Sequence, residues 1–390
     1  MTHFIKKMLP ADSATVAVNS LAQQKINEGI KIYNFSTGEP RLPPHPSIVT
    51  ATTEALEQGK TLYPPVAGIP ELRHLASSWM HKMYGCSFTK ENCLVVNGGK
   101  FGIYLLMQLL VQQNDEVIIP APYWVSYPAM AQLFGGTPVM VDTKEAEGWK
   151  LTPHALKKAC TPQSKLLILN NATNPTGALY SADELAELLH VAQEHNLLII
   201  ADEVYSALTY DKQAYVSCGS FPQFQERVVV IQSCSKNFAM TGWRIGFVFA
   251  PQSIIQPLTT LVSQSTSGVT TLSQWAAMAA LNEANNINIW VQQCMQKRRN
   301  AIINALYTAF GISIRPPASS LYLFLSIKNL GFAEENSEEF CKQALEKAHV
   351  ALVPGIAFGK EGYVRMSFGG NEEDLKTGVE ALAQWLHHNA

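Results

Sequence analysis

Short apolar runs alternate with helical patterns through the middle of this chain, and this alternation limits the possible folds more than any other feature. The runs lie at residues 93–97, 116–119, 138–142, 165–170, 197–201, 228–232 and 245–250. They lack polar alternation, which is typical of strands covered on both faces. A helical pattern over 181–195 begins with Ser181 and Glu184, a capping-box signature. The order strand, helix, strand predicts an α/β fold with a large domain, whose mostly parallel central sheet is covered by helices.

The pattern changes after residue 285. A long helical segment, two strands with a helix between them and a final helix predict a smaller α+β domain at 286–390. Residues 1–45 have no strand pattern of their own, so we expect them to pack with the small domain or with a partner subunit. The large domain is then predicted at 46–285, a division that suits a chain of 390 residues.

Charge and cysteine content exclude several classes of protein. Lysine and arginine number 29 against 31 aspartates and glutamates, so the chain lacks the basic excess that nucleic-acid binding needs. No apolar run approaches the roughly 18–20 residues that cross a bilayer. The seven cysteines are odd in number and form no CxxC pair, which argues against a disulfide framework or a zinc site. We expect a cytoplasmic protein with no metal, nucleic-acid or membrane partner.

The densest group of chemically active side chains follows the apolar run at 228–232. Ser233, Lys236 and Arg244 lie in the stretch SCSKNFAMTGWRIG, directly after a predicted strand. Ligands of open α/β sheets bind at the carboxyl ends of strands. A hydroxyl, a lysine and an arginine at such an end suit an anionic ligand and a nucleophilic amine. A single lysine here is also compatible with a solvated loop, so the inference depends on the whole pattern.

Three weaker motifs lie at other strand ends. Asp202 ends the run LLIIAD, Asn174 belongs to the turn NPTG, and Gly99 and Lys100 begin a helix after a strand. Free N–H groups at a helix N-terminus bind anions. A cation in the first helical turn opposes the helix dipole, which favours a bound anion nearby. Each motif also has a structural interpretation: a strand-ending turn, an ordinary turn and a solvated lysine.

Together and in this order, the motifs resemble those of the class I aminotransferases, which are fold-type I enzymes that use pyridoxal 5′-phosphate. The resemblance extends from about residue 12 to the end of the chain. It implies that Lys236 binds the cofactor as a Schiff base and then serves as the catalytic base. It also implies that Arg244 and Ser233 hold the phosphate, and that Asp202 pairs with the pyridinium nitrogen and keeps it protonated.

The same resemblance implies further roles in cofactor binding. Tyr205 and Asn174 would contact the phenolic oxygen, Trp124 would stack on the pyridine ring, and Gly99 and Lys100 would complete the phosphate cup through their backbone. Without the resemblance, Trp124 and Tyr205 are equally interpretable as packing residues.

Six positions are implied to act on the substrate or across a dimer. Arg365 would hold the substrate's α-carboxylate, with Gly38 contacting it through the backbone, and Asn174 and Trp124 also border the substrate. Lys100 matches a lysine that binds the distal carboxylate of acidic substrates in one branch of aspartate aminotransferases. Tyr63 matches a tyrosine that reaches the phosphate of the neighbouring subunit, which requires a homodimer with shared active sites. On its own, Arg365 is also compatible with a surface-facing edge strand.

The resemblance implies an enzyme of amino acid metabolism that moves an amino group from an L-amino acid to a 2-oxo acid such as 2-oxoglutarate. Aspartate aminotransferase-like specificity is the first expectation, and aromatic or broad specificity is the second. A pyridoxal-phosphate-dependent C–S lyase on the same fold is an alternative because the motifs are largely shared, and a non-catalytic regulator is another. The chain departs from the family pattern at Arg41, Gly268 and Ser319, which leaves the substrate open.

Overall fold

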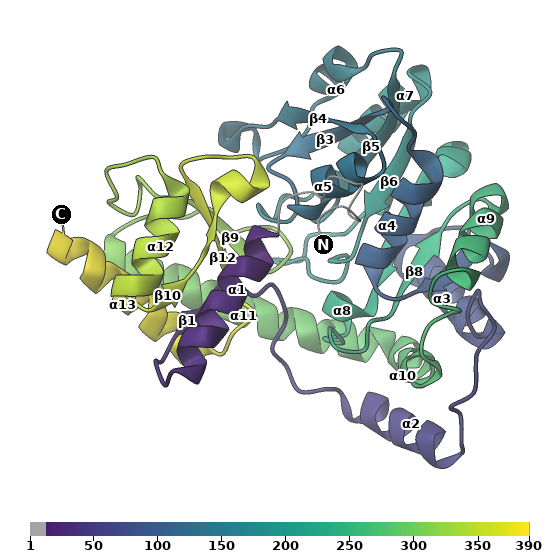
Figure 1. The fold of residues 1–390 in the computed structure, drawn as a ribbon, viewed down its shortest axis with the longest axis horizontal. Coiled ribbons are helices and arrows are strands. Elements are labelled where there is room, and N and C mark those ends of the chain that lie inside the picture. Colours follow the sequence, from purple (N-terminus) through teal and green to yellow (C-terminus); the bar gives the residue numbers. More distant parts are fainter. Residues whose placement is uncertain (1–12, 390) are drawn as a thin grey trace, which may run out of the picture.

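A seven-stranded sheet forms the centre of the computed structural model, which describes residues 13–389 (Figure 1). The strand order is β2–β8–β7–β6–β5–β3–β4. β8 runs antiparallel to both of its neighbours, β2 and β7, and every other adjacent pair of strands described for this sheet is parallel. The predicted α/β class with a mostly parallel sheet is confirmed. The strands are β2 (Cys93–Val96), β3 (Glu116–Ala121), β4 (Thr137–Asp142), β5 (Ser164–Asn170), β6 (Leu198–Asp202), β7 (Val228–Ser233) and β8 (Gly246–Phe249).

Successive residues of the central strands enter two different apolar cores, which explains why their sequences do not alternate with polar residues. In β5, Leu167 and Leu169 pack in one core, and Leu166 and Ile168 pack in the other. The first core includes α3 (Pro70–Tyr84), α7 (Ala182–Glu194) and α10 (Thr271–Asn282). The second includes α4 (Gly99–Leu110), α5 (Ser126–Leu133) and α9 (Gln252–Ser263). The remaining large-domain helices are α2 (Pro46–Glu57), α6 (Pro153–Ala159) and α8 (Cys234–Asn237).

The predicted capping box begins α7 as expected. The backbone N–H of Ser181 donates to Oε2 of Glu184 at 2.8 Å, and the backbone N–H of Glu184 donates to the Ser181 hydroxyl at 3.3 Å. The two contacts pair N–H groups that a helix start otherwise leaves without partners.

A smaller antiparallel sheet of β11 (Val353–Pro354), β12 (Tyr363–Ser367) and β9 (Tyr322–Ser326) lies beside the large domain, as Figure 1 shows. It is accompanied by α12 (Ser337–Lys347) and α13 (Glu372–Asn389). The long helix α11 (Ala284–Phe310) runs from the large domain to α13. The residue boundaries at 45 and 285 stay predictions.

The first described helix packs against elements of the small domain. In α1 (Ala14–Asn27), Ala22 contacts Leu345 and Ala351. The N-terminal segment has no strand pattern in its sequence, yet β1 (Tyr33–Asn34) pairs in parallel with β10 (Val350–Ala351). A two-residue strand leaves no periodic pattern in a sequence, so only its pairing partner reveals it.

Residues 13–389 contain no helix of the length and hydropathy that a bilayer span requires. The same residues contain no cluster of three or more histidine, cysteine, aspartate or glutamate side chains arranged to hold a metal ion.

Candidate active site

A cavity of about 420 Å³ lies at the carboxyl ends of the parallel strands, between the large sheet and the N-terminal segment. The ends of β5, β6 and β7 contribute to its wall, as does the first turn of α4. Of the residues that the sequence predicted for the site, only Tyr63 does not line this cavity. The residues that do line it are Gly38, Gly99, Lys100, Trp124, Asn174, Asp202, Tyr205, Ser233, Lys236, Arg244 and Arg365. The fold thus gathers residues that are far apart in the chain, as expected for an open α/β sheet.

Lys236 lies in α8, the short helix that follows β7, and its amine points across the cavity to donate a hydrogen bond to the carbonyl oxygen of Gly38. Burial lowers the pKa of Lys236 to about 8, although the nearby carboxylate of Glu39 acts in the opposite direction. A lysine with this pKa is uncharged in a sizeable fraction of molecules near neutral pH, and only the uncharged amine is a nucleophile.

Asp202 ends β6 and is 4% exposed. Burial raises its pKa to about 6, and a hydrogen bond from the Tyr127 hydroxyl acts against this rise. That bond joins the Tyr127 oxygen to Oδ2 of Asp202 at 2.6 Å. Sequence reasoning missed Tyr127. Its spacing of three residues from Trp124 was an available signal, because the turn that leads into α5 brings the two ring centroids within 5.3 Å of each other.

The phosphate end of the predicted site collects positive charge and backbone N–H groups. Gly98 precedes α4 with a φ of 86°, and a Cβ atom there would lie 2.5 Å from Nη2 of Arg244. Only glycine therefore allows the arginine to lie against the start of this helix. The Ser233 hydroxyl accepts the backbone N–H of Ser235 at 3.1 Å. A helix N-terminus, an arginine and a hydroxyl together suit a phosphate group.

Lys100 lies in the first turn of α4 and over a ring of the site. Its Nζ is 4.8 Å from the ring centroid of Trp124. Burial lowers the pKa of Lys100, and the positive charge of Arg244 lowers it further. Lys100 forms no ion pair within residues 13–389. The cavity therefore holds a cation without an acidic partner, which favours an anionic ligand.

Arg365 lies in β12 at the other end of the cavity and is 2% exposed. Its Nη2 donates to the carbonyl of Ser36 at 2.6 Å, and its Nη1 donates to Oδ1 of Asn174 at 3.3 Å. Its Nε has no hydrogen-bond partner among the described residues. Burial lowers the pKa of Arg365. A buried guanidinium with a free donor and only neutral partners is suited to bind a carboxylate.

Tyr205 and Tyr322 form a hydroxyl pair between these two ends. Their oxygens are 2.8 Å apart, and the ring centroid of Tyr322 lies 4.4 Å from the guanidinium of Arg365. A Cβ atom on Gly38 would overlap the Tyr322 hydroxyl, so the close approach of this backbone requires glycine. Sequence reasoning missed Tyr322, which lies three residues after Ser319.

Tyr63 lies outside the cavity and is 92% exposed. Gly268 is beside the same segment, since a Cβ atom on it would be 3.5 Å from Cγ of Pro64. Arg41 does not line the cavity either, and its Nε is 3.9 Å from Oε1 of Glu39. Ser319 is fully buried and donates to the carbonyl of Gly177 at 2.9 Å.

Fold and site together describe an α/β protein whose cavity combines a lysine of lowered pKa, a cationic helix N-terminus suited to an anion and a buried arginine suited to a carboxylate. A family model described as "Aminotransferase class I and II" matches residues 30–382. The aspartate aminotransferase of Geobacillus stearothermophilus is 36% identical over 97% of both chains. The aspartate/prephenate aminotransferase of Thermus thermophilus is 35% identical over 96% of both chains.

A solved structure gives the same result. The structure titled as aspartate aminotransferase from Thermus thermophilus with maleate superposes with a TM-score of 0.91 at 34% identity, covering 96% of this chain and 97% of the other. The chain belongs to the class I and II aminotransferase family. It is an aminotransferase that depends on pyridoxal 5′-phosphate and acts on amino acids and 2-oxo acids.

The described residues fit this cofactor. One end of the cavity presents a helix N-terminus and Arg244 to an anion, and Lys236 has a depressed pKa beside it. Asp202 offers a buried carboxylate on the same wall. The unpartnered Nε of Arg365 leaves a donor for the substrate at the opposite end.

Proposed function

We propose that this enzyme transfers the amino group of an aspartate-like dicarboxylic amino acid to a 2-oxo acid such as 2-oxoglutarate. The observation that carries the proposal is that two of the four described basic side chains in the cavity, Lys100 and Arg365, remain for the substrate when Lys236 and Arg244 serve the cofactor. Arg365 suffices for one carboxylate, and Lys100 lines the same cavity without an ion-pair partner among the described residues. A substrate with two carboxylates satisfies both cations. The names of the relatives favour the same substrate class.

Pyridoxal phosphate, when bound, supplies an aldehyde that takes up the amino group and a ring that accepts an electron pair. Lys236 would hold the cofactor and then, as a free amine, take the α-proton of the substrate. Its pKa of about 8 suits a base that works near neutral pH. Asp202 would keep a negative charge beside the ring nitrogen, and Tyr205 would donate to the phenolic oxygen. Arg365 would fix the α-carboxylate and so orient the α-proton.

The remaining groups would hold the cofactor in place. Arg244, Ser233 and the backbone of Gly99 and Lys100 would bind the phosphate. Trp124 would stack on the ring, and Asn174 would contact both the phenolic oxygen and the substrate side of the cavity. Gly38 would meet the α-carboxylate through its backbone.

The enzyme would work as a homodimer in the cytoplasm. Tyr63 and its neighbour Leu62 are 92% and 81% exposed in one chain, which is unusual for side chains of this kind in a monomer and favours burial against a partner. Tyr63 would then complete the phosphate site of the partner subunit. The odd number of cysteines favours a reducing compartment.

A donor-by-acceptor screen on the purified protein tests the substrate proposal. We expect the highest kcat/KM with aspartate or glutamate as donor and a dicarboxylic 2-oxo acid as acceptor. A clear preference for aromatic donors would contradict the dicarboxylic substrate. Release of ammonia with a single 2-oxo acid, without transfer to the acceptor, would instead identify a lyase. Lys236→Ala serves as control, because borohydride should then trap no cofactor on the protein.

A further inference from the structure

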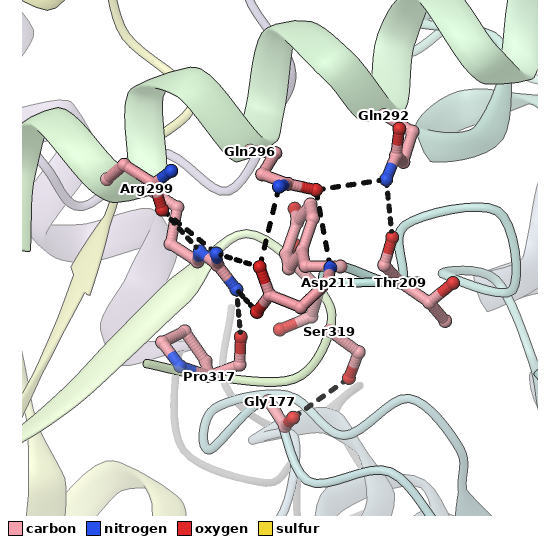
Figure 2. A network of polar contacts seen from close by, with 11 residues as sticks. Gly177, Thr209, Asp211, Gln292, Gln296, Arg299, Pro317 and Ser319 are labelled. Atoms are coloured by element: carbon pink, nitrogen blue, oxygen red, sulfur yellow. Dashed lines mark hydrogen bonds and ion pairs between the residues drawn. The ribbon is translucent and has the colours of Figure 1, made fainter. Parts of the chain in front are cut away.

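Arg299 is a buried arginine of α11 that lies outside the cavity and joins two loop segments (Figure 2). Its side chain is 3% exposed. Its Nη1 and Nη2 bind the carboxylate of Asp211 at 2.6 and 2.8 Å, and Nη1 also donates to the carbonyl of Pro317 at 3.1 Å. One guanidinium therefore holds segment 208–211 and segment 317–320 at once.

The two segments are also bonded directly to each other. The backbone N–H of Tyr210 donates to the carbonyl of Ala318, and that of Ser320 donates to the carbonyl of Leu208, both at 2.9 Å. The Tyr210 hydroxyl donates to the carbonyl of Ser320. The ring of Tyr210 lies under the guanidinium of Arg299, 4.8 Å from its carbon. The two segments thus form one hydrogen-bonded unit.

Each segment leads directly to one member of the hydroxyl pair in the cavity. The backbone N–H of Leu208 donates to the carbonyl of Tyr205 at 2.8 Å, so segment 208–211 continues from the turn of that tyrosine. Segment 317–320 ends two residues before Tyr322, where β9 begins. Arg299 therefore joins the two backbone segments that position the hydroxyls of Tyr205 and Tyr322, which are 2.8 Å apart.

Ser319 adds a contact to the large domain. Its hydroxyl donates to the carbonyl of Gly177 at 2.9 Å, and Gly177 closes the turn that carries Asn174 (Figure 2). A glycine at position 319 cannot make this bond. The unit held by Arg299 is therefore fixed to a second loop of the cavity.

We propose that Arg299 and Asp211 are positioning residues for the reaction: they fix the Tyr205–Tyr322 hydroxyl pair in the place from which Tyr205 donates to the cofactor. This inference rests on the proposed role of Tyr205. A functional hydrogen bond requires its donor to be held within about 0.5 Å of the productive position. A bidentate arginine–carboxylate pair specifies geometry more strictly than a lysine can, because the guanidinium is a rigid planar fork.

The test measures the pH midpoint at which the bound cofactor changes its absorbance in the holoenzyme. A hydrogen bond donated to the phenolic oxygen favours the more anionic form of the cofactor and so lowers this midpoint. Tyr205→Phe should raise it. Arg299→Met should raise it by about half a pH unit, which is about a threefold change in the proton equilibrium. Asp211→Asn, which keeps the side-chain shape, should shift it in the same direction.

Two comparisons separate positioning from general stability. Lys297→Met removes a neighbouring ion pair of α11, with Glu372 at 2.7 Å on an exposed surface, and should leave the midpoint unchanged. In a Tyr205→Phe background, Arg299→Met should add no further shift, because the hydroxyl that it positions is gone. A further shift in that background would overturn the inference. The inference would also be overturned if Arg299→Met lowered only the heat stability of the enzyme and left the midpoint unshifted.

The design also distinguishes failure of this inference from failure of the proposed function. If Tyr205→Phe shifts the midpoint and neither Arg299→Met nor Asp211→Asn does, the positioning role is wrong and the role of Tyr205 stands. If Tyr205→Phe itself leaves the midpoint unchanged, the role of Tyr205 is wrong, and the positioning role falls with it. Should Arg299→Met fail to fold, Asp211→Asn gives the same decision.

Discussion

The hydroxyl of Tyr127 lies 2.6 Å from Oδ2 of Asp202 and donates a hydrogen bond to it. Both side chains are buried, at 2% and 4% exposure. Burial raises the pKa of Asp202 to about 6 and so favours its protonated, neutral form. The hydrogen bond from Tyr127 is the largest of the contacts that oppose this rise. The tyrosine therefore helps this carboxyl group to remain an anion near neutral pH.

Removing the Tyr127 hydroxyl should weaken cofactor binding. Tyr127→Phe raises the pKa of Asp202, so a smaller fraction carries the negative charge that faces the ring nitrogen. We expect the dissociation constant of pyridoxal phosphate to rise by about threefold to tenfold. The rise should be larger below neutral pH than in alkaline solution, where Asp202 is ionised in both proteins. Equilibrium dialysis measures it, with the exposed Tyr307→Phe as control. Equal affinities at slightly acid pH would contradict the role.

The reactivity of Lys236 should follow its depressed pKa. When pyridoxal phosphate is added to cofactor-free protein, the rate of colour formation should rise with pH and reach half its plateau near a pH of about 8. The carboxylate of Glu39 raises this pKa, so Glu39→Gln should move the midpoint to lower pH. Glu372→Gln, in an exposed ion pair of the small domain, is the matched control. An unmoved or raised midpoint in Glu39→Gln would contradict the electrostatic assignment.

Lys100 should discriminate between classes of substrate. Lys100→Ala should lower kcat/KM for dicarboxylic donors by about tenfold to a hundredfold, the effect expected for one lost charge-assisted hydrogen bond. Aromatic donors should lose much less. Burial lowers the pKa of Lys100. As the pH rises, Lys100 should therefore lose its charge, and the enzyme its preference for dicarboxylic donors, at a lower pH than an ordinary lysine would. Equal losses for both classes of donor would rule out this role.

Tyr63 tests whether two subunits share an active site. Tyr63→Ala should bind cofactor more weakly, and Lys236→Ala should be inactive. If Tyr63 acts on the partner subunit, mixed dimers of the two variants contain one intact site, and mixing them should restore activity. The measurement is specific activity after the variants are unfolded and refolded together, with each variant refolded alone as control. No recovery in dimers shown by mass to be mixed would place Tyr63 outside the partner's site.

Much of the fold followed from local pattern. The apolar run ending at Asp202 predicted β6 because a strand buried on both faces needs apolar residues at every position, and the structure places its residues in two cores. The capping box of Ser181 and Glu184 predicted the start of α7 for a similarly local reason. β1 escaped prediction because a two-residue strand is defined only by its partner β10.

By itself, the sequence determined the class of fold, the family, and many of the residues that gather around the cavity (though not Tyr127 or Tyr322), since these depend on short patterns and on motifs in a fixed order. Only the tertiary structure decided which of those residues hold one another. Tyr127 and Asp202 are 75 residues apart in the chain, Asp211 and Arg299 are 88 apart, and Tyr205 and Tyr322 are 117 apart. Such hydrogen bonds arise from the packing of whole strands and helices, and no local pattern of residues encodes them.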